Sequence, residues 1–182
     1  MCGVCGIVNF NGISKTDDSK RVINRMVNKL ENRGPDGSDI KVHKTFMFGH
    51  SRLSIIDLSN NASQPMNDLS NNLTITFNGE IYNYIELRQE LLSLGFEFKT
   101  HSDTEVILNG YRAYGIEGIL NKCKGMWALA IYDKQRDELI LARDRFGEKP
   151  LYYGWVNNRF IFASDLFAIR KYPGRNLSIN NE

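Results

Sequence analysis

The chain has 182 residues, of which 42% are hydrophobic and 24% charged, and its formal net charge is +2 at neutral pH. These values fit one globular domain with its own core and give no electrostatic reason to expect nucleic acid or membrane partners. No run of 18 apolar residues and no signal-peptide pattern is present, so we expect no membrane span. The three cysteines are too few for a disulfide framework and indicate a cytoplasmic protein.

The N-terminus places a cysteine directly behind the initiator methionine. Loss of Met1 would give Cys2 a free α-amine, whose ordinary pKa of about 7.7–8.0 lets it accept the thiol proton. Nucleophile and base would then come from one residue. Taken alone, a chance N-terminal cysteine is the more frequent explanation. A redox or metal role for the Cys2–Cys5 pair has little support, because neither a second pair nor a nearby histidine accompanies it.

The first third of the chain predicts two strands, a helix and a loop. Residues 4–10 form a short apolar run typical of a buried strand, and residues 17–31 carry apolar side chains at helical spacing. The segment 32–37 contains two glycines and a proline and predicts a tight loop. Arg33 and Asp36 either brace this loop or lie beside an active site. A strand is expected near 39–42.

A long strand-like segment over 46–56 contains His50 and Arg52 among apolar residues. A buried guanidinium needs an anionic partner, and its fork of donors matches a carboxylate in a two-pronged manner. A structural salt bridge is the more common reason for such an arginine. We expect His50 to be a hydrogen-bonded core histidine without a catalytic role.

The middle of the chain predicts a loop over 60–72, a strand over 73–77 and a helix over 82–94. Asn78-Gly79 lies between strand and helix. An Asn-Gly pair is usually a hairpin turn, but here we expect it to turn the strand into the helix, where its N–H donors could hold an oxyanion. Ser102 and Glu105 have capping-box spacing and begin a helix that runs towards Gly115. A short helix over 116–121 follows, with an inert Cys123 near its end.

The last third is rich in strand patterns. Residues 125–133 predict a strand buried on both faces, paired with 139–143, and residues 151–156 and 159–163 predict a hairpin through Asn157-Asn158. The charged loop 143–150 is a weak candidate for nucleic-acid binding, because its acids nearly balance its bases. A closing helix is expected over 164–171, followed by a polar tail over 174–182.

Eight sequence blocks point to one family when they are read together: CG (2–3), RGPDG (33–37), HSRLSIIDL (50–58), QPM (64–66), FNGEIYNY (77–84), SDTEVIL (102–108), GMWALAIYD (125–133) and ARDRFGEKPLYY (142–153). They resemble the glutaminase domain of glutamine-dependent asparagine synthetases, a class II glutamine amidotransferase domain. The resemblance implies an α+β fold, the four-layer αββα sandwich of the N-terminal nucleophile (Ntn) hydrolases. It also implies one domain over 1–182, with 174–182 beginning a linker.

The resemblance further implies a role for individual residues. Cys2 is the expected nucleophile after loss of Met1, and the Asn78 side chain and the Gly79 backbone N–H are the expected oxyanion hole. Arg52 would hold the α-carboxylate of the substrate, and Glu80 and Asp103 would face its α-ammonium group. The remaining residues implied to bind substrate are Leu53, Ser54, Ile55 and Ile56, along with Asn78 and Gly79.

The reaction implied is hydrolysis of L-glutamine to glutamate and ammonia through a γ-glutamyl thioester. The ammonia would serve a C-terminal synthetase domain that is absent from this chain. No cofactor or metal is expected in the glutaminase domain, whereas ATP and Mg²⁺ are expected in the synthetase domain. Neither nucleic acid nor membrane is an expected partner, and a homodimer is an open alternative.

Three other functions stay open at this point. The same glutaminase chemistry could serve another acceptor, such as a surface-polysaccharide sugar acid. The chain could instead be a non-catalytic glutamine-binding domain, although an intact set of Cys2, Arg52, Asn78, Gly79 and Asp103 argues against a retired site. An N-terminal nucleophile peptidase or acylase is the third alternative, but such enzymes usually expose their nucleophile by cutting a propeptide.

Overall fold

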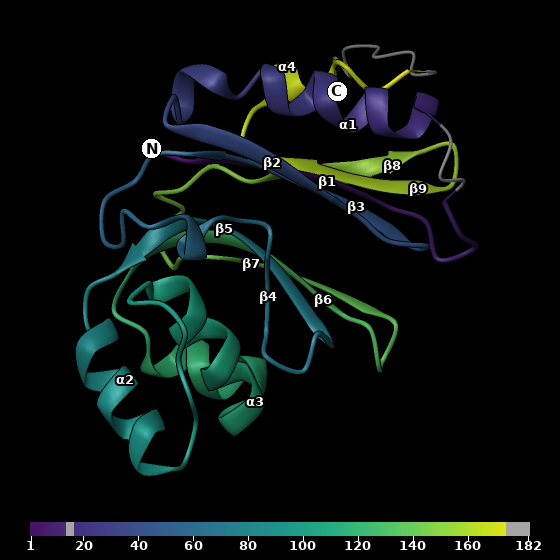
Figure 1. The fold of residues 1–182 in the computed structure, drawn as a ribbon. Coiled ribbons are helices and arrows are strands. Elements are labelled where there is room, and N and C mark those ends of the chain that lie inside the picture. The colour runs from purple at the N-terminus through teal and green to yellow at the C-terminus, as the bar shows by residue number, and fades with distance from the viewer. Residues whose placement is uncertain (14–16, 174–182) are drawn as a thin grey trace.

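The computed structural model describes residues 1–13 and 17–173, which form two antiparallel sheets stacked face to face. Sheet A has the strand order β2-β3-β1-β9-β8, and sheet B has the order β4-β5-β6-β7. Helices cover the outer side of each sheet, so the layers run helix, sheet, sheet, helix (Figure 1). This architecture is the four-layer arrangement that the sequence analysis predicted. The expected linker over 174–182 lies outside the described residues.

Most strands lie close to their predicted positions, but the loop expected over 60–72 contains a short strand, because Met66 and Asn67 pair with the strand that follows. Those of sheet A are β1 (Gly3–Val8), β2 (Gly37–Val42), β3 (Phe46–Arg52), β8 (Tyr152–Val156) and β9 (Arg159–Ala163). Those of sheet B are β4 (Met66–Asn67), β5 (Leu73–Ile81), β6 (Gly125–Asp133) and β7 (Glu138–Arg143). The expected continuation of β3 to residue 56 is wrong. The pairing of Gly37 with Arg52 is the last in its ladder, so the chain beyond has no partner strand and forms a loop.

The helices divide between the two outer layers. On sheet A lie α1 (Asp17–Asn28) and α4 (Leu166–Ile169), and on sheet B lie α2 (Tyr84–Ser93) and α3 (Asp103–Lys122) (Figure 1). Short 3-10 helices occupy Glu31–Arg33 and Asn60–Ala62. Gly115 interrupts α3 with a φ of +71°, which accounts for the two separate helical patterns in the sequence. No helix among the described residues is both long and apolar enough to cross a bilayer.

The structure contradicts the expected turn at Asn78-Gly79. Both residues lie inside β5, where they pair with Ala128 and Trp127 of β6. The strand continues to Ile81 because β6 supplies a partner for every residue back to Gly125. An Asn-Gly pair signals a turn only where the chain has no neighbouring strand to pair with.

Side chains alternate between the two faces of each sheet, and this alternation decides which residues meet between the sheets. In β1, Cys5 and Ile7 pack against α1 in the outer core, together with Ile23. Val8 faces the other way and packs with Phe48, while Ala130 of sheet B joins the same central cluster. Cys2 and Val8 are an even number of positions apart, so their side chains point to the same face, and that of Cys2 lies between the sheets.

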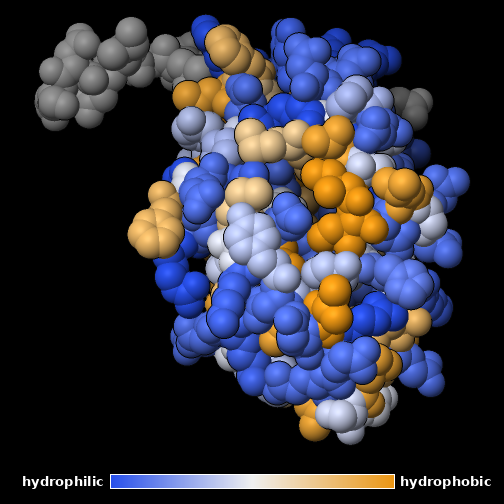
Figure 2. All heavy atoms as spheres, turned by 90° about the vertical axis from the view of Figure 1, so that its left-hand side faces the viewer, coloured by the Kyte–Doolittle hydropathy of each residue, from blue (hydrophilic) through white to orange (hydrophobic). Residues whose placement is uncertain are grey.

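The N-terminal end of β1 lies towards one narrow side of the sandwich (Figure 1). Figure 2 shows this side, where hydrophobic residues form a broken band among hydrophilic ones. Ile55 and Leu58, in the loop that follows β3, are 62% and 74% exposed. The loop that leaves β3 therefore carries apolar surface outwards as well as lining the pocket described next.

Candidate active site

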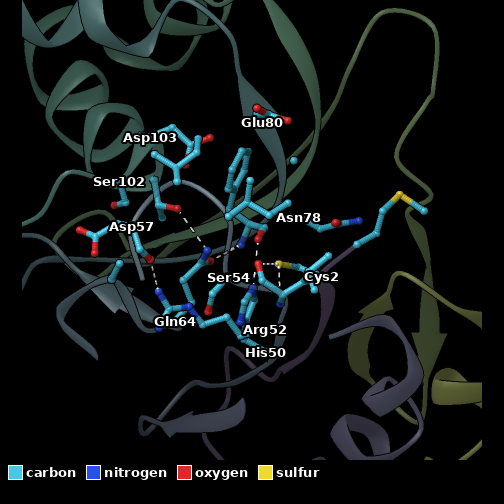
Figure 3. Close-up of a pocket in the computed structure, with 18 of the residues that line it drawn as sticks. Cys2, His50, Arg52, Ser54, Asp57, Gln64, Asn78, Glu80, Ser102 and Asp103 are labelled. Carbon is cyan, nitrogen blue, oxygen red and sulfur yellow. Dashed lines mark hydrogen bonds between the residues drawn. The ribbon is translucent and has the colours of Figure 1, made fainter. Parts of the chain in front are cut away.

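A pocket lies where β1, β3 and β5 meet the start of α3 (Figure 3). It is lined by every residue that the sequence analysis placed at the site: Cys2, Arg52, Leu53, Ser54, Ile55, Ile56, Asn78, Gly79, Glu80 and Asp103. The structure thus brings together residues that are spread over a hundred positions of the chain.

Strand register places Cys2 beside Arg52. Gly3 pairs with Ser51 in the β1–β3 ladder, so Cys2 and Arg52 are the next positions at its end. Arg52 shares the side-chain direction of Phe48, which packs between the sheets. The nucleophile candidate and the guanidinium therefore enter the pocket from neighbouring strands of one sheet.

The Cys2 thiol is half-buried and contacts the loop after β3. Its Sγ accepts a hydrogen bond from the Leu53 N–H at 3.3 Å and lies 3.5 Å from the Leu53 carbonyl oxygen. Burial raises the pKa of the thiol, whereas the Leu53 N–H, the charge of the chain terminus and Arg52 act to lower it. A base is therefore needed to generate the thiolate near neutral pH.

Arg33 and Asp36 both brace the loop and lie beside the site, so the two roles considered from the sequence coincide. The Arg33 Nε donates to the Cys2 carbonyl oxygen at 3.1 Å. Asp36 accepts the backbone N–H of Ser54 at 2.8 Å. These contacts fix the backbone on either side of the Cys2 thiol.

Within the described residues, Arg52 lacks the anionic partner that its position in the sequence suggests. Its guanidinium donates to the backbone carbonyls of Asp57 and Ser59, and it forms no ion pair with a carboxylate of the described residues. A structural salt bridge is therefore not the reason for this arginine in the part of the chain described. The two carbonyls orient the guanidinium, and its charge stays available to an anionic ligand in the pocket.

His50 is a core histidine, as the sequence analysis expected. It is 1% exposed, and its Nε2 lies 3.2 Å from the carbonyl oxygen of Phe77 in the facing sheet. Burial lowers its pKa to about 4, so the ring is neutral at physiological pH. It therefore adds no charge to the pocket.

One side-chain donor and one backbone donor of β5 point into the pocket. Asn78 is 1% exposed, yet its Nδ2 has no hydrogen-bond partner among the described residues. The Phe77 and Ile81 N–H groups lie on the edge of β5 that faces away from β6. They donate hydrogen bonds to the Gln64 Oε1 at 2.7 Å and to the Asp103 Oδ2 at 3.0 Å. Because N–H groups alternate between the two edges of a strand, the Gly79 N–H points away from the same edge as those of Phe77 and Ile81.

Gly79 cannot be replaced without moving the chain. A Cβ at this position would lie 2.4 Å from the Met126 carbonyl oxygen and 2.8 Å from the Phe77 ring. The bare backbone lets β5 pass close to β6 while its N–H faces the pocket. Two such donors at one point suit an oxygen that gains negative charge during a reaction.

Acidic side chains occupy the opposite side of the pocket, where Figure 3 shows Asp103 and Glu80 away from Cys2 and Arg52. Asp103 begins α3, is 5% exposed and accepts the Ile81 N–H. Burial raises its pKa to about 6, and the charge of Glu80 adds to the shift. The pocket therefore has a cationic and an anionic side, as a zwitterionic ligand requires.

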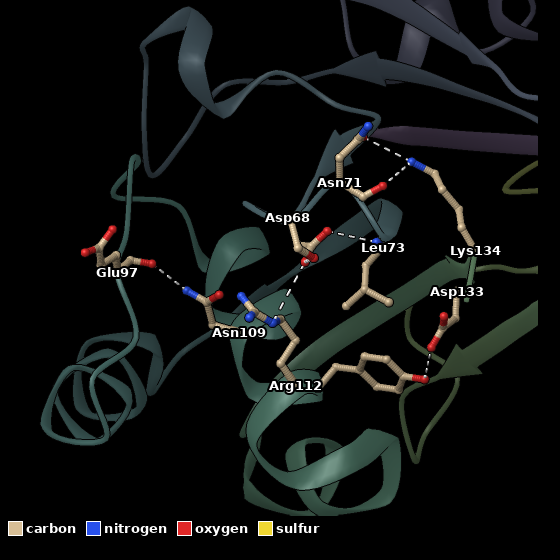
Figure 4. Close-up of polar contacts among 10 residues, drawn as sticks. Asp68, Asn71, Leu73, Glu97, Asn109, Arg112, Asp133 and Lys134 are labelled. Carbon is tan, nitrogen blue, oxygen red and sulfur yellow. Dashed lines mark hydrogen bonds and ion pairs between the residues drawn. The ribbon is translucent and has the colours of Figure 1, made fainter. Parts of the chain in front are cut away.

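Helix α3, which carries Asp103, is fastened to sheet B further along by polar contacts (Figure 4). Asp68 follows β4, is 6% exposed, and accepts the Leu73 N–H at 2.8 Å and the Ser70 hydroxyl. Its Oδ2 lies 3.9 Å from the Arg112 Nε of α3. On the same helix, the Tyr111 hydroxyl donates to Asp133, the last residue of β6, at 3.1 Å.

Replacing Asp68 with alanine should lower the free energy of unfolding by about 2 kcal/mol, because a buried N–H loses its acceptor and Arg112 its counter-charge. Urea denaturation followed by far-UV circular dichroism measures this. Asp18→Ala, which removes an exposed carboxylate from α1, should change stability by less than about 0.5 kcal/mol. Equal stability of the Asp68→Ala protein and the unchanged protein would show that the network adds nothing.

Gln64 and Lys149 also line the pocket, and the sequence analysis assigned neither of them to the site. The Gln64 Oε1 accepts the Phe77 N–H, and its Nε2 donates to Thr104 at 3.1 Å, so it ties β5 to α3. The QPM block was the signal that could have identified Gln64. Over residues 1–13 and 17–173, no three His, Cys, Asp or Glu side chains cluster as metal ligands do.

The whole chain, residues 1–182, matches the family model described as glutamine amidotransferase domain. It is 44% identical over 165 residues to asparagine synthetase (glutamine-hydrolyzing) 1 of Bacillus subtilis strain 168, which covers 91% of this chain and 26% of that protein. It is 33% identical over 175 residues to amidase chry2 of Gibberella zeae, with the same two coverages, 91% and 26%. The chain thus spans about a quarter of the length of these curated relatives.

Among solved structures, the glutamine phosphoribosylpyrophosphate amidotransferase from B. subtilis is similar with a TM-score of 0.77 at 24% sequence identity. The likeness covers 93% of this chain and 43% of that one. At this identity it bears on the fold alone, and it confirms the predicted four-layer αββα sandwich.

Proposed function

The chain belongs to the glutamine amidotransferase domain family, and from this we propose that it hydrolyses L-glutamine to glutamate and ammonia through a thioester on Cys2. The observation that carries the proposal is the presence of a half-buried thiol and two hydrogen-bond donors in one pocket. One of these donors, the Asn78 Nδ2, is buried and has no partner among the described residues. A buried donor without a partner is costly, so a ligand that accepts from it repays the cost.

The charges of the pocket match free glutamine. Arg52 would hold the α-carboxylate with the donors that its two carbonyl contacts leave free, and Asp103 and Glu80 would hold the α-ammonium group. The loop 53–56 would line the aliphatic part of the substrate. Held at both charges, glutamine could extend its side-chain amide to the Cys2 end of the pocket. Positioning of this kind contributes much of the rate of an acyl transfer.

The reaction requires that Met1 be removed, because only then is the Cys2 nitrogen an amine that accepts a proton. The amine takes the thiol proton, and the thiolate attacks the side-chain carbonyl carbon of glutamine. A C–S bond forms, and the carbonyl electron pair moves onto the oxygen between Asn78 and Gly79. The amine then returns the proton to the leaving nitrogen as the C–N bond breaks, and ammonia departs.

Water completes the cycle. The Cys2 amine accepts a proton from a water molecule, whose oxygen attacks the thioester carbonyl, and the same two donors hold the second oxyanion. The C–S bond breaks, glutamate leaves, and the proton returns to the thiolate. One residue thus acts as nucleophile, base and acid in both halves of the reaction.

The names and lengths of the relatives support a proposal for the use of the ammonia. Since several of them are named asparagine synthetases and are about four times as long as the match, we infer a second domain that consumes the ammonia with ATP and Mg²⁺ to make asparagine. The relative named amidase chry2 matches over a similar region, which favours a second candidate, the same glutaminase chemistry serving another acceptor. The cytoplasmic location and the homodimer stay predictions.

The proposal is tested by intact mass together with an assay of glutamate and ammonia released from glutamine. A mass short by one methionine with equal amounts of both products supports it. Complete processing without product formation contradicts the catalytic function, and glutamine binding to such a protein would then indicate a glutamine-binding domain.

Binding of glutamine should weaken as the pH falls below about 6. Above its pKa of about 6, Asp103 is a carboxylate that attracts the substrate ammonium group, and below it the neutral acid loses that attraction. Affinity should fall up to about tenfold for each pH unit below the pKa. Titration calorimetry with a Cys2→Ala protein between pH 5 and 8 measures this without turnover. The matched Asp103→Asn protein should bind weakly and evenly across the range, and an equally even profile in the parent would refute the prediction.

A further inference from the structure

Lys149 is a buried lysine in the wall of the pocket, and the mechanism above does not use it. It lies in the loop after β7 and is 5% exposed. Its backbone is held on both sides, because its N–H donates to Asp144 at 3.0 Å and its carbonyl oxygen accepts from the Arg143 Nε at 2.8 Å. The backbone from which this side chain extends into the pocket wall is therefore held by hydrogen bonds on both sides.

The partner of this ammonium group is weak. The Nζ lies 3.1 Å from the Sδ of Met1, and a thioether is a poor hydrogen-bond acceptor. No carboxylate within the described ranges forms an ion pair with Lys149. A buried cation without a counter-charge is costly, so its retention calls for a functional reason. Loss of Met1 would remove even the thioether.

Covalent geometry bounds the distance from this cation to the reactive residue. The Cys2 nitrogen is five bonds from the Met1 Sδ, so the Lys149 Nζ lies within roughly 9 Å of it. A positive charge at that distance favours loss of protons from both the amine and the thiol. The amine and the thiol belong to one residue and titrate as a coupled pair.

The other charged groups of the pocket explain why such a cation is useful. Asp103 acts to raise the pKa of the Cys2 thiol, and Arg52 acts to lower it. Asp103, a carboxylate proposed to face the substrate ammonium group, therefore works against formation of the thiolate. The titratable and charged groups around Cys2 are Arg33, His50 and Arg52 from the sheet A side, Asp57 from the following loop, Glu80 from β5, Asp103 from α3 and Lys149.

We propose that Lys149 is a positioning residue for the Cys2 dyad: its buried ammonium group keeps the α-amine uncharged and favours the thiolate, offsetting the acidic side of the pocket. The inference rests on the proposed function, since it concerns the form of Cys2 that carries a free amine. It assigns Lys149 no contact with the reacting atoms.

The pH dependence of Cys2 alkylation by iodoacetamide tests the proposal without glutamine. The protein is used with Met1 removed, as verified by mass, and the modified peptide is quantified. Lys149→Met, an unbranched neutral replacement, should raise the midpoint of the pH profile of Cys2 alkylation by about one pH unit. Lys149→Arg should keep the midpoint of the parent. Lys29→Met, which removes an exposed cation outside the pocket, should also leave it unchanged.

The outcomes separate this inference from the proposed function. An unchanged midpoint in Lys149→Met and in a second neutral variant, Lys149→Gln, overturns the inference even if glutaminase activity is present. The inference is supported if the alkylation midpoint rises and the low-pH side of the kcat/KM profile shifts to higher pH by a similar amount. A raised midpoint in a protein that never hydrolyses glutamine refutes the proposed function and leaves the electrostatic role in place. A chain that retains Met1 contradicts both.

Discussion

Replacing Cys2 with alanine should reduce ammonia release from glutamine by about 10⁴-fold or more, because no other group can form the acyl intermediate. Glutamine should still bind, since the groups proposed to hold its two charges, Arg52 and Asp103, do not depend on the sulfur. Coupled assays of ammonia and glutamate measure the first effect, and calorimetry measures the second. The alanine also removes little packing, because the thiol is only half-buried.

Cys5→Ala is the matched control for this variant. Cys5 is 0% exposed and faces α1 on the other side of the sheet, and burial raises its pKa. The control should lose some stability through the small cavity but keep the activity of each folded molecule. Activity that survives in Cys2→Ala, or that disappears equally in Cys5→Ala, would show that the Cys2 thiol is not the nucleophile.

Replacing Asn78 with alanine should lower kcat by about 100- to 1000-fold while changing KM little. The Nδ2 of this residue is buried without a partner in the described residues, so its hydrogen bond would form mainly when the substrate oxygen gains charge. Steady-state kinetics over a range of glutamine concentrations separates the two constants. The protein should fold normally, since the Nδ2 donates no hydrogen bond within the described residues that the change would remove.

Thr76→Val provides the control on the same face of β5. It removes the hydroxyl that donates to the Gly49 carbonyl oxygen at 3.3 Å, two residues before Asn78. This change should cost stability and leave kcat within about twofold. A loss of kcat in Thr76→Val as large as in Asn78→Ala would mean that distortion of β5, rather than a missing donor, explains the effect.

Local patterns were enough to predict most of the secondary structure. The apolar spacing of residues 17–31 and the unbroken apolar run over 125–133 match α1 and β6, because burial of a face imposes the period of the element. Asn157 and Asn158 adopt positive φ values of 49° and 60°, as a tight hairpin turn requires. The strand, helix and hairpin signals here depend on near neighbours in the chain.

The wrong secondary-structure predictions concern segments whose conformation depends on strands that are distant in the sequence. Asn78-Gly79 looked like a turn, yet β6 pairs with both residues and holds them in a strand. Residues 53–56 looked like strand, yet neither β1 nor β2 reaches them. Strand ends depend on the length of the neighbouring strand, which no local pattern encodes.

The sequence by itself determined the family, the layers of the fold and most of the residues that meet in the pocket, although it did not identify Gln64 and Lys149 there. Residue chemistry alone suggested the Cys2 dyad, a carboxylate-binding Arg52 and oxyanion donors at Asn78-Gly79. The resemblance related these groups to glutamine and added the other substrate-binding residues. The tertiary structure decided what each group contacts: Arg52 on two carbonyls, Asn78 with an unpaired amide, Lys149 against Met1. The physical reason is that alternation along a strand sets the face to which a side chain points, whereas packing of the two sheets sets its partner and its burial.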